Sequence, residues 1–204
     1  FSALIAAFLQ MKARSPADFE AVNVEGMRHV CRAALESGVE RLVEVSTNDV
    51  FGLREDIEID ERCDFRGWGE PYPDTKLAAT RIAWEFSRQG LPVSMVYPCW
   101  IYGPGDLTFV PLLADAIRKN QLFFWRKDVI LWPAYIENVV DLLWLVSRHP
   151  AAVGQGFLVH DGVSDTLQGF SRRIAAAIGA REPRTRVPYA AACASAWAME
   201  LAWR

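Results

Sequence analysis

The sequence predicts an α/β fold: a parallel β-sheet followed by a smaller α/β lobe. Short apolar runs typical of buried strands alternate with segments of helical periodicity, and the connections between them are short. That alternation favours a parallel sheet with right-handed crossovers. With 204 residues, of which 51% are hydrophobic, the chain can bury one substantial core.

The first predicted elements are a strand, a helix and a second strand. Phe1 to Ala7 is a short apolar run of the kind found in buried parallel strands. Ser15-Pro16-Ala17-Asp18 is typical of a helix start, with serine at the N-cap and proline at the first position. This helix is predicted to run to about Ser37, where Gly38 can end it. Arg41 to Ser46 alternates in polarity and ends in a hydroxyl, which indicates a strand.

A loop, a helix and a third strand are predicted next. Arg54 to Gly69 is charged and irregular, as expected of a surface loop. Tyr72 to Gln89 has helical periodicity and is followed by Gly90, a natural stop. Val93 to Pro98 is again apolar and predicts the third strand.

The pattern changes at Gly103-Pro104-Gly105-Asp106, after which the predicted elements are shorter. A helix, a strand, a helix, a strand and a helix are expected at residues 110–119, 129–132, 136–147, 156–159 and 166–178. Val187 to Arg204 is an apolar, alanine-rich helical run, interpreted as a packing helix and not a membrane-touching one. Both ends of the sequence stop abruptly, which suggests a piece of a longer protein.

Composition and spacing disfavour several classes of function. A net charge of −3 without a basic run gives no electrostatic reason to expect a nucleic-acid partner. Phe1 to Leu9 is too short to span a bilayer, so no membrane span is predicted. The histidines share no ligand spacing, and no metal site is expected. The cysteines are widely spaced and indicate reduced thiols in a cytoplasmic protein: Cys31, Cys63, Cys99 and Cys193.

Tyr72 and Lys76 are the candidate catalytic residues that say most about the function of the protein. Four residues apart on a helix, they project from one face, so the ammonium is expected to lower the tyrosine pKa from about 10. Thr47, at the end of the second strand, can bind the same substrate oxygen, with Ser46 as its competitor. A chance Tyr-x-x-x-Lys has odds of roughly one in ten, so the pair gains its weight from the preceding strand and hydroxyl turn.

Several segments, in order, resemble the extended short-chain dehydrogenase/reductase superfamily, in its NAD-dependent epimerase/dehydratase and 3β-hydroxysteroid dehydrogenase branches. The segments that carry the resemblance are Val22-Asn23-Val24-Glu25-Gly26, Ser46-Thr47-x-x-Val50-Phe51-Gly52, Pro71-Tyr72-Pro73 with Lys76, Tyr97 to Asp106, Tyr135 to Val139 and Asp161-Gly162. Counting back from Gly52 places Thr47 at the catalytic Ser/Thr position. The resemblance covers nearly the whole chain, although the family's N-terminal strands and glycine-rich turn are not in it.

The resemblance implies a Rossmann-like parallel sheet and a nicotinamide cofactor, NAD or NADP. It implies that Thr47, Tyr72 and Lys76 are catalytic. The cofactor-binding residues implied are Ser46, Tyr72, Lys76, Pro98 and Cys99. Residues 1–106 are then a partial dinucleotide-binding domain with the catalytic residues, and residues 107–204 are mainly a substrate-binding lobe with a C-terminal helix. A homodimer is a candidate assembly, because helices beside this site often pair in the superfamily.

Departures from the family pattern narrow the expected reaction. Sugar-nucleotide dehydratases carry Asp-Glu after the catalytic threonine, whereas this chain has Asn48-Asp49, so a dehydratase is disfavoured. The expected lobe has few arginines to grip a diphosphate, with Arg118 and Arg126 the clearest candidates. It is rich in aromatic residues instead, which favours a sterol-like or other hydrophobic substrate: Trp100, Phe123, Phe124, Trp125 and Trp132.

The predicted function is therefore NAD(P)-dependent oxidoreduction of a secondary alcohol or ketone, a small-molecule substrate. Two alternatives remain open. One is a nucleotide-sugar epimerase using the same Thr-Tyr-Lys residues. The other, from a different class, is a non-catalytic dinucleotide-binding or scaffold protein, although such proteins usually lose the Tyr-Lys pair that is present here.

Overall fold

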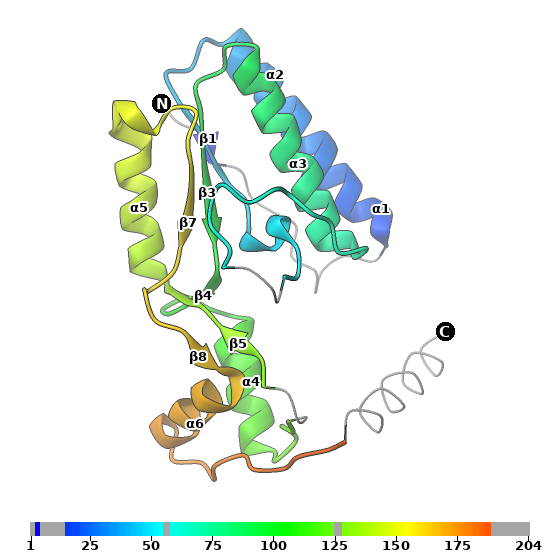
Figure 1. The fold of residues 1–204 in the computed structure, drawn as a ribbon, viewed down its shortest axis with the longest axis vertical. Helices are drawn as coiled ribbons and strands as arrows, with labels where there is room; N and C mark the ends of the chain where they lie inside the picture. Colours follow the sequence, from blue (N-terminus) through cyan, green and yellow to red (C-terminus); the bar gives the residue numbers. More distant parts are fainter. Residues whose placement is uncertain (1–2, 5–14, 55–57, 125–127, 189–204) are drawn as a thin grey trace. The chain divides into compact units, whose positions relative to one another are not determined.

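The structure is a computed structural model that describes residues 3–4, 15–54, 58–124 and 128–188. The chain groups into two compact units. The first comprises Phe1–Cys99 with Glu137–His160, and the second comprises Trp100–Ile136 with Asp161–Arg204. Each unit is described below by itself (Figure 1).

A four-stranded parallel sheet forms the centre of the first unit. Its strands are ordered β1-β2-β3-β7, with bounds Ala3–Leu4, Leu42–Val45, Val93–Pro98 and Gly156–Val159. In the register, Leu42 pairs with Val93, and Met95 pairs with Gly156. Every residue of β3 is buried, as expected of a strand covered on both faces. The predicted α/β class with a parallel sheet is confirmed.

The first helical stretch begins where its sequence signals predicted. Ser15 precedes α1 (Pro16–Phe19), and the Ser15 backbone N–H donates to Asp18 Oδ2 at 3.1 Å. The chain then passes through a π-helical segment, η2 (Glu20–Glu25), into α2 (Gly26–Glu36). Gly38 follows with φ of +62°, a left-handed conformation that glycine adopts without a Cβ penalty.

Helices α2 and α3 (Pro71–Arg88) cover one face of this sheet, and α5 (Ile136–Arg148) covers the other (Figure 1). Between the sheet and α2 and α3 lies the main apolar core, which includes Met27, Leu42, Leu77, Ile82, Val93 and Met95. The end of α5 is joined to the sheet by Arg41, whose Nη1 donates to the carbonyl oxygens of Val146 at 2.8 Å and His149 at 3.1 Å. A short 3-10 helix, η4 (Pro150–Ala152), leads into β7.

The second unit contains two small sheets and two helices. Strand β4 (Trp100–Tyr102) pairs in parallel with β6 (Pro133–Tyr135), and β5 (Ile130–Leu131) pairs antiparallel with β8 (Asp165–Thr166). Helices α4 (Phe109–Arg118) and α6 (Leu167–Ala177) pack through Leu113, Ile117, Ile174 and neighbouring apolar residues. The strand predicted at residues 129–132 is β5, and a second strand that was not predicted, β6, begins directly after Trp132 and pairs with a different partner.

Some sequence predictions concern residues that the structure does not describe. The terminal helical run lies outside the described residues beyond Pro188, as do most of Phe1 to Ala7, Trp125, Arg126 and Cys193. The assignment of residues 107–204 to substrate binding stays a prediction, and residues 137–160 belong by their contacts to the first unit. Among the described helices, none has the length and apolarity needed to cross a membrane.

Candidate active site

Two hydroxyl residues follow β2 at its carboxyl end, Ser46 and Thr47. The Ser46 N–H donates to Val96 O at 2.8 Å, and its Oγ lies 2.6 Å from Thr80 Oγ1 on α3. Thr47 precedes the 3-10 helix η3 (Asn48–Phe51), and its Oγ1 accepts from Asp49 N at 3.3 Å. Ser46 thus joins the strand to α3, whereas the Thr47 hydroxyl faces the first turn of α3, where it hydrogen-bonds Tyr72.

Tyr72 is the second residue of α3 and is half-buried. Its ring packs edge-on against Phe19, with the ring centroids 6.4 Å apart. Burial and, after it, the negative charge of Asp49 raise the pKa of Tyr72 to about 12, against the opposing effect of the hydrogen bond with Thr47. The expectation that Lys76 lowers the pKa of Tyr72 is wrong for the arrangement in the structure, because the pKa is raised and the contribution that opposes the rise comes from Thr47.

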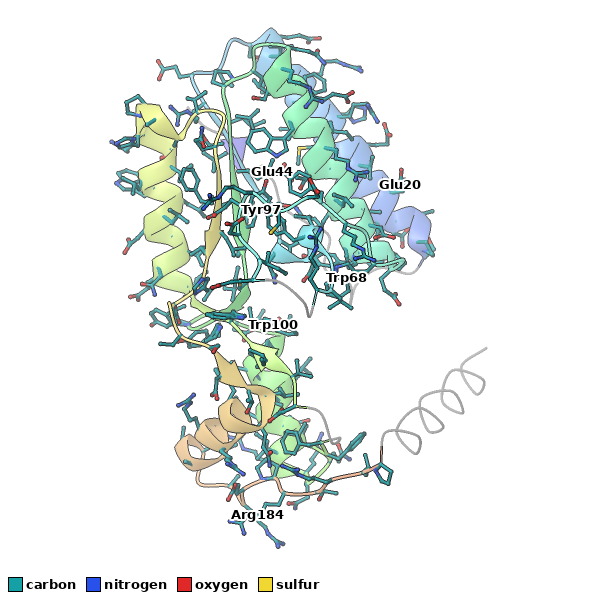
Figure 2. The ribbon with its side chains drawn as sticks, viewed as in Figure 1. Glu20, Glu44, Trp68, Tyr97, Trp100 and Arg184 are labelled. Carbon is teal, nitrogen blue, oxygen red and sulfur yellow. The ribbon has the colours of Figure 1, made fainter. Side chains whose placement is uncertain are left out.

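Lys76 lies one turn further along α3 and is 2% exposed. Its Nζ donates to the carbonyl oxygen of Val45 at 2.9 Å and lies 3.8 Å from Glu44 Oε1. Burial lowers the pKa of Lys76, and the Glu44 carboxylate opposes that shift. The ammonium is therefore directed at the end of β2, and Figure 2 shows Glu44 beside α3.

Two acidic residues of this region were not among the predicted site residues. Glu44 is fully buried on β2, and Asp49 on η3 hydrogen-bonds the Thr47 side chain. Burial raises the pKa of Asp49, and the bond from Thr47 opposes that rise. The signal for Glu44 was present in the sequence, because a charged residue interrupts the apolar strand Leu42–Val45.

Asn23 and Thr75 fix the first turn of α3 against the π-helical segment. Asn23 Nδ2 donates to Thr75 Oγ1 at 3.1 Å, and Thr75 Oγ1 donates to Pro71 O at 2.6 Å. Asn23 thus contacts α3. The π-helical segment places this amide against the same turn that carries Tyr72.

Pro98 ends β3, and Cys99 follows it. The Cys99 N–H donates to Val159 O at 3.0 Å, which continues the pairing of β3 with β7. Burial raises the pKa of the half-buried Cys99 thiol to about 12, with the charge of Asp49 contributing. The thiol is therefore neutral near pH 7, and the predicted contact of Pro98 and Cys99 with a nicotinamide stays a prediction.

The loop before α3 is held by Asp74. Its carboxylate accepts hydrogen bonds from Trp68 N at 2.8 Å and Gly69 N at 3.0 Å. The Trp68 indole N–H donates to Asp49 O at 2.7 Å, so the loop is anchored to η3 as well. Trp68, which is 36% exposed and labelled in Figure 2, is therefore held beside η3.

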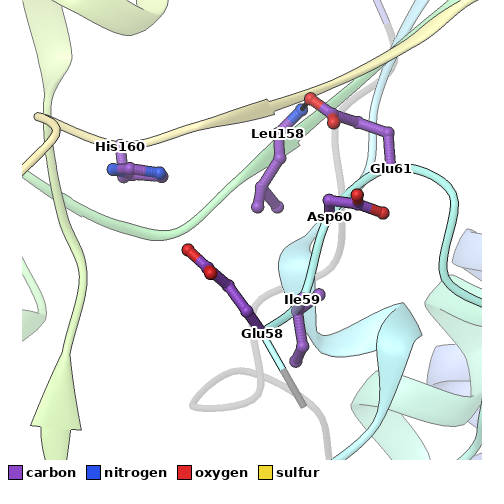
Figure 3. Close-up of a pocket in the computed structure, with 6 residues that line it drawn as sticks. All are labelled: Glu58, Ile59, Asp60, Glu61, Leu158 and His160. Atoms are coloured by element: carbon purple, nitrogen blue, oxygen red, sulfur yellow. Dashed lines mark hydrogen bonds between the residues drawn. The ribbon is translucent and has the colours of Figure 1, made fainter.

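A cavity of about 330 Å³ lies elsewhere in the first unit (Figure 3). It is lined by Glu58, Ile59, Asp60, Glu61, Leu158 and His160. Glu61 closes one side, since its Oε1 accepts from Leu158 N on the edge strand β7 at 2.8 Å. None of these residues was a predicted site residue.

The carboxyl end of β2 thus carries a hydroxyl, a phenol and an ammonium, at the edge where parallel α/β sheets bind ligands. A parallel sheet with helices on both faces and such a group at the strand ends defines a Rossmann-like α/β protein. Comparison with family models is more specific: residues 3–159 match the NAD dependent epimerase/dehydratase family. The chain belongs to that family, which confirms the resemblance seen in the sequence.

Two relatives of the chain are a ketoreductase and a dehydrogenase by name. The chain is 29% identical over 98% of its length to a 4-hydroxy-2-methyl-3-oxo-4-farnesyl-3,4-dihydroquinoline-1-oxide ketoreductase from Stigmatella aurantiaca, of which it covers 60%. It is 27% identical over 81% of its length to a 3-beta-hydroxysteroid dehydrogenase from Mycolicibacterium neoaurum, of which it covers 48%. The chain therefore spans about half to three fifths of the length of these relatives.

Solved structures show the same fold. The crystal structure of the dTDP-glucose 4,6-dehydratase DesIV from Streptomyces venezuelae matches 92% of the chain with a TM-score of 0.80 at 20% identity, and the chain covers 60% of it. An epimerase from Methanothermobacter thermautotrophicus matches 92% of the chain with a TM-score of 0.80 at 21% identity, and the chain covers 59% of it. At these identities the likeness is one of fold.

Proposed function

We propose that the protein is an NAD(P)-dependent oxidoreductase that interconverts a secondary alcohol and a ketone. The observation that carries the proposal is the contact of Thr47 with Tyr72 at the carboxyl end of β2, with Lys76 one helical turn away. Family membership supports it, because the family is NAD dependent by description.

The donor set fits a nicotinamide ribose. Lys76 donates to Val45 O at 2.9 Å and lies 3.8 Å from Glu44 Oε1, and an ammonium has three N–H groups. Lys76 and the Tyr72 hydroxyl can therefore hold the ribose hydroxyls, with Pro98 and Cys99 at the end of the neighbouring strand. When bound, the dinucleotide supplies the hydride donor or acceptor.

Each side chain has a role that follows from its chemistry. Thr47 binds the substrate oxygen and orients it toward Tyr72. Because the pKa of Tyr72 is raised to about 12, the phenol is protonated near pH 7 and can donate its proton to a ketone oxygen. In the reverse direction the phenolate takes the alcohol proton, so alcohol oxidation should rise with pH.

A hydrophobic substrate is the class that we favour. The relatives named above include a ketoreductase for a farnesylated quinoline oxide and a hydroxysteroid dehydrogenase. Asn48 and Asp49 follow Thr47, and an asparagine cannot donate and recover a proton as an acid does, which disfavours dehydration of a sugar.

The test uses the full-length protein. Oxidation of NADH and NADPH is followed with a panel of hydrophobic ketones, including steroid ketones, for the wild type, Tyr72→Phe and Tyr97→Phe. Loss of the Tyr72 hydroxyl should lower kcat by about 100-fold or more. Tyr97 is a matched control, because its hydroxyl contacts Trp84 Nε1 at 3.2 Å in the core. Retention of most activity by Tyr72→Phe would refute the mechanism, and a wild type inactive on every substrate would favour a binding or scaffold role.

A further inference from the structure

A buried carboxylate lies beneath the candidate catalytic lysine. Glu44 is 0% exposed, and among the described residues neither of its side-chain oxygens has a hydrogen-bond partner within 3.5 Å. Its only described ion pair is with Lys76, at 3.8 Å between Oε1 and Nζ. A buried acid with so few partners needs an explanation other than packing, because an apolar side chain would fill the space without the desolvation cost.

The position of Glu44 on β2 explains why it meets Lys76. Side chains alternate along a strand, so Glu44 faces the same side as Leu42, which packs in the core beneath α2 and α3. Lys76 reaches down from α3 to this side of the strand and donates to Val45 O. The two side chains therefore meet inside the core, close to the carboxyl end of β2.

The groups around Glu44 come from three elements. Lys76 on α3 is the cation, while Cys31 on α2 and Tyr97 on β3 also interact with Glu44 electrostatically. Burial, followed by Glu44, raises the pKa of Cys31 to about 12; burial likewise raises the pKa of Tyr97. Both are neutral near pH 7, so once Glu44 is ionised, above its raised pKa of about 7, the described group that balances its charge is Lys76.

We propose that Glu44 is a positioning residue, which holds the Lys76 ammonium at the end of β2 and keeps it protonated where burial alone would discharge it. The inference rests on the proposed function, in which a charged Lys76 binds the cofactor ribose. Glu44 acts through Lys76 and touches neither cofactor nor substrate. Its effect is largest at alkaline pH, where a buried lysine without a counter-charge loses its proton.

The pH dependence of activity is the first test. In the full-length protein, kcat/KM for ketone reduction is measured from about pH 6 to about pH 10. The proteins compared are the wild type, Glu44→Gln, Glu44→Asp and Glu40→Gln. The alkaline decline should move to lower pH by about one unit or more in Glu44→Gln, about a tenfold loss at the affected pH. Glu44→Asp keeps a carboxylate, so the alkaline decline should shift less in this variant than in Glu44→Gln. Glu40→Gln removes the same charge at an exposed position nearby and should leave the profile unchanged.

The protonation of Lys76 is measured separately, so that the inference does not depend on activity. The full-length protein is labelled with ¹³C,¹⁵N-lysine, and the Lys76 side-chain resonances, assigned with Lys76→Met, are titrated by NMR in the wild type and in Glu44→Gln. The Lys76 midpoint should fall by about one pH unit or more in Glu44→Gln. An unchanged midpoint, or a loss of activity that is equal at every pH, overturns the proposal. If Glu44→Gln does not fold, the same titration of Glu44→Asp decides, because a shorter carboxylate should lower the midpoint by less.

Discussion

Lys76 Nζ lies 3.8 Å from Glu44 Oε1, and the two side chains are 2% and 0% exposed. At that separation the pair is an ion pair without a short hydrogen bond, and Nζ donates to Val45 O instead. Buried ion pairs of this kind seldom add net stability compared with apolar residues of similar size, but breaking one leaves an unpaired charge. The free energy of unfolding of the protein should therefore depend strongly on whether one or both partners are replaced.

A double-mutant cycle on the pair should show strong coupling. Lys76→Met leaves Glu44 buried without its cation and should destabilise the protein by about 3–5 kcal/mol. Adding Glu44→Leu removes the orphaned carboxylate and should recover most of that loss. Urea unfolding of the wild type, both single variants and the double variant measures the four free energies. Additive effects would mean that the two side chains do not interact in the folded protein.

The stability of the protein should depend on pH through Glu44. Burial raises the pKa of Glu44 from 4.5 to about 7, with Lys76 opposing the shift. Between these values the folded state keeps a proton that the unfolded state has released, so stability falls as pH rises through this window. The slope contributed by one proton is at most about 1.4 kcal/mol per pH unit.

Glu44→Gln has no such proton and should show a flatter dependence of unfolding free energy on pH. The measurement is chemical denaturation from about pH 5 to about pH 8, with Glu40→Gln as the exposed control. Parallel curves for the wild type and Glu44→Gln would contradict the prediction. Because the pKa of Lys76 is lowered from 10.5, Lys76 has the opposite effect: it makes stability rise with pH between its folded pKa and 10.5.

Sequence patterns predicted the elements of the first unit better than its side-chain contacts. Ser15, Pro16 and Gly38 marked helix ends correctly, because capping and positive φ are local properties of the backbone. The spacing of Tyr72 and Lys76 placed both on one helix, as observed. Helical spacing fixes the direction of Cβ but not the end of a long side chain, so the turn of Lys76 toward β2 was not predictable from it.

The partners of buried polar groups also depended on tertiary packing. Glu44 was visible in the sequence as a charge in an apolar strand, yet its partner depends on which helix covers that face. Ser46 and Thr47 were competing candidates in the sequence, and the contact of Ser46 with Thr80 depends on how α3 packs against β2. The change of partner around Trp132 was missed because strands of two or three residues have little periodicity.

Asp74 should control the order of the loop that carries Trp68. Asp74→Ala removes the acceptor for two backbone N–H groups and should cost about 1–2 kcal/mol of stability. Hydrogen exchange of the Trp68 and Gly69 amides should become faster than in the wild type. Asp74→Asn keeps one side-chain oxygen and should have an intermediate effect. Unchanged exchange in Asp74→Ala would show that other contacts hold the loop.

Arg41 should be a main attachment of α5 to the sheet. Its guanidinium donates to two carbonyl oxygens at the end of this helix, and it is 9% exposed. Arg41→Met leaves those carbonyls without their cationic donor and should cost about 2–3 kcal/mol. Arg148→Met is the matched control on the same helix, because Arg148 is exposed and lies over the Trp144 ring; it should cost less than about 1 kcal/mol. Equal losses in urea unfolding would contradict the assignment.

Asp106 should make the second unit sensitive to acid. Its carboxylate accepts from the backbone N–H groups of Thr108 at 2.8 Å, Phe109 at 3.0 Å and Val110 at 2.8 Å, which caps the start of α4. Burial raises the pKa of Asp106, but the bonds from Val110, Thr108 and Phe109 outweigh it and lower the pKa overall. Asp106→Ala should therefore cost about 1–2 kcal/mol at pH 7.

The sign of the pH effect follows from that lowered pKa. The stabilisation by Asp106 is present above the usual aspartate pKa of about 4 and is lost as pH falls through the lower folded value. Asp106→Asn has an acceptor oxygen but no titrating proton, so the wild type should lose its advantage over this variant in acid. Denaturant unfolding at about pH 7 and about pH 3, followed by a probe in the second unit, compares them. A difference between wild type and Asp106→Asn that stays constant over this range would show that the charge of Asp106 does not stabilise α4.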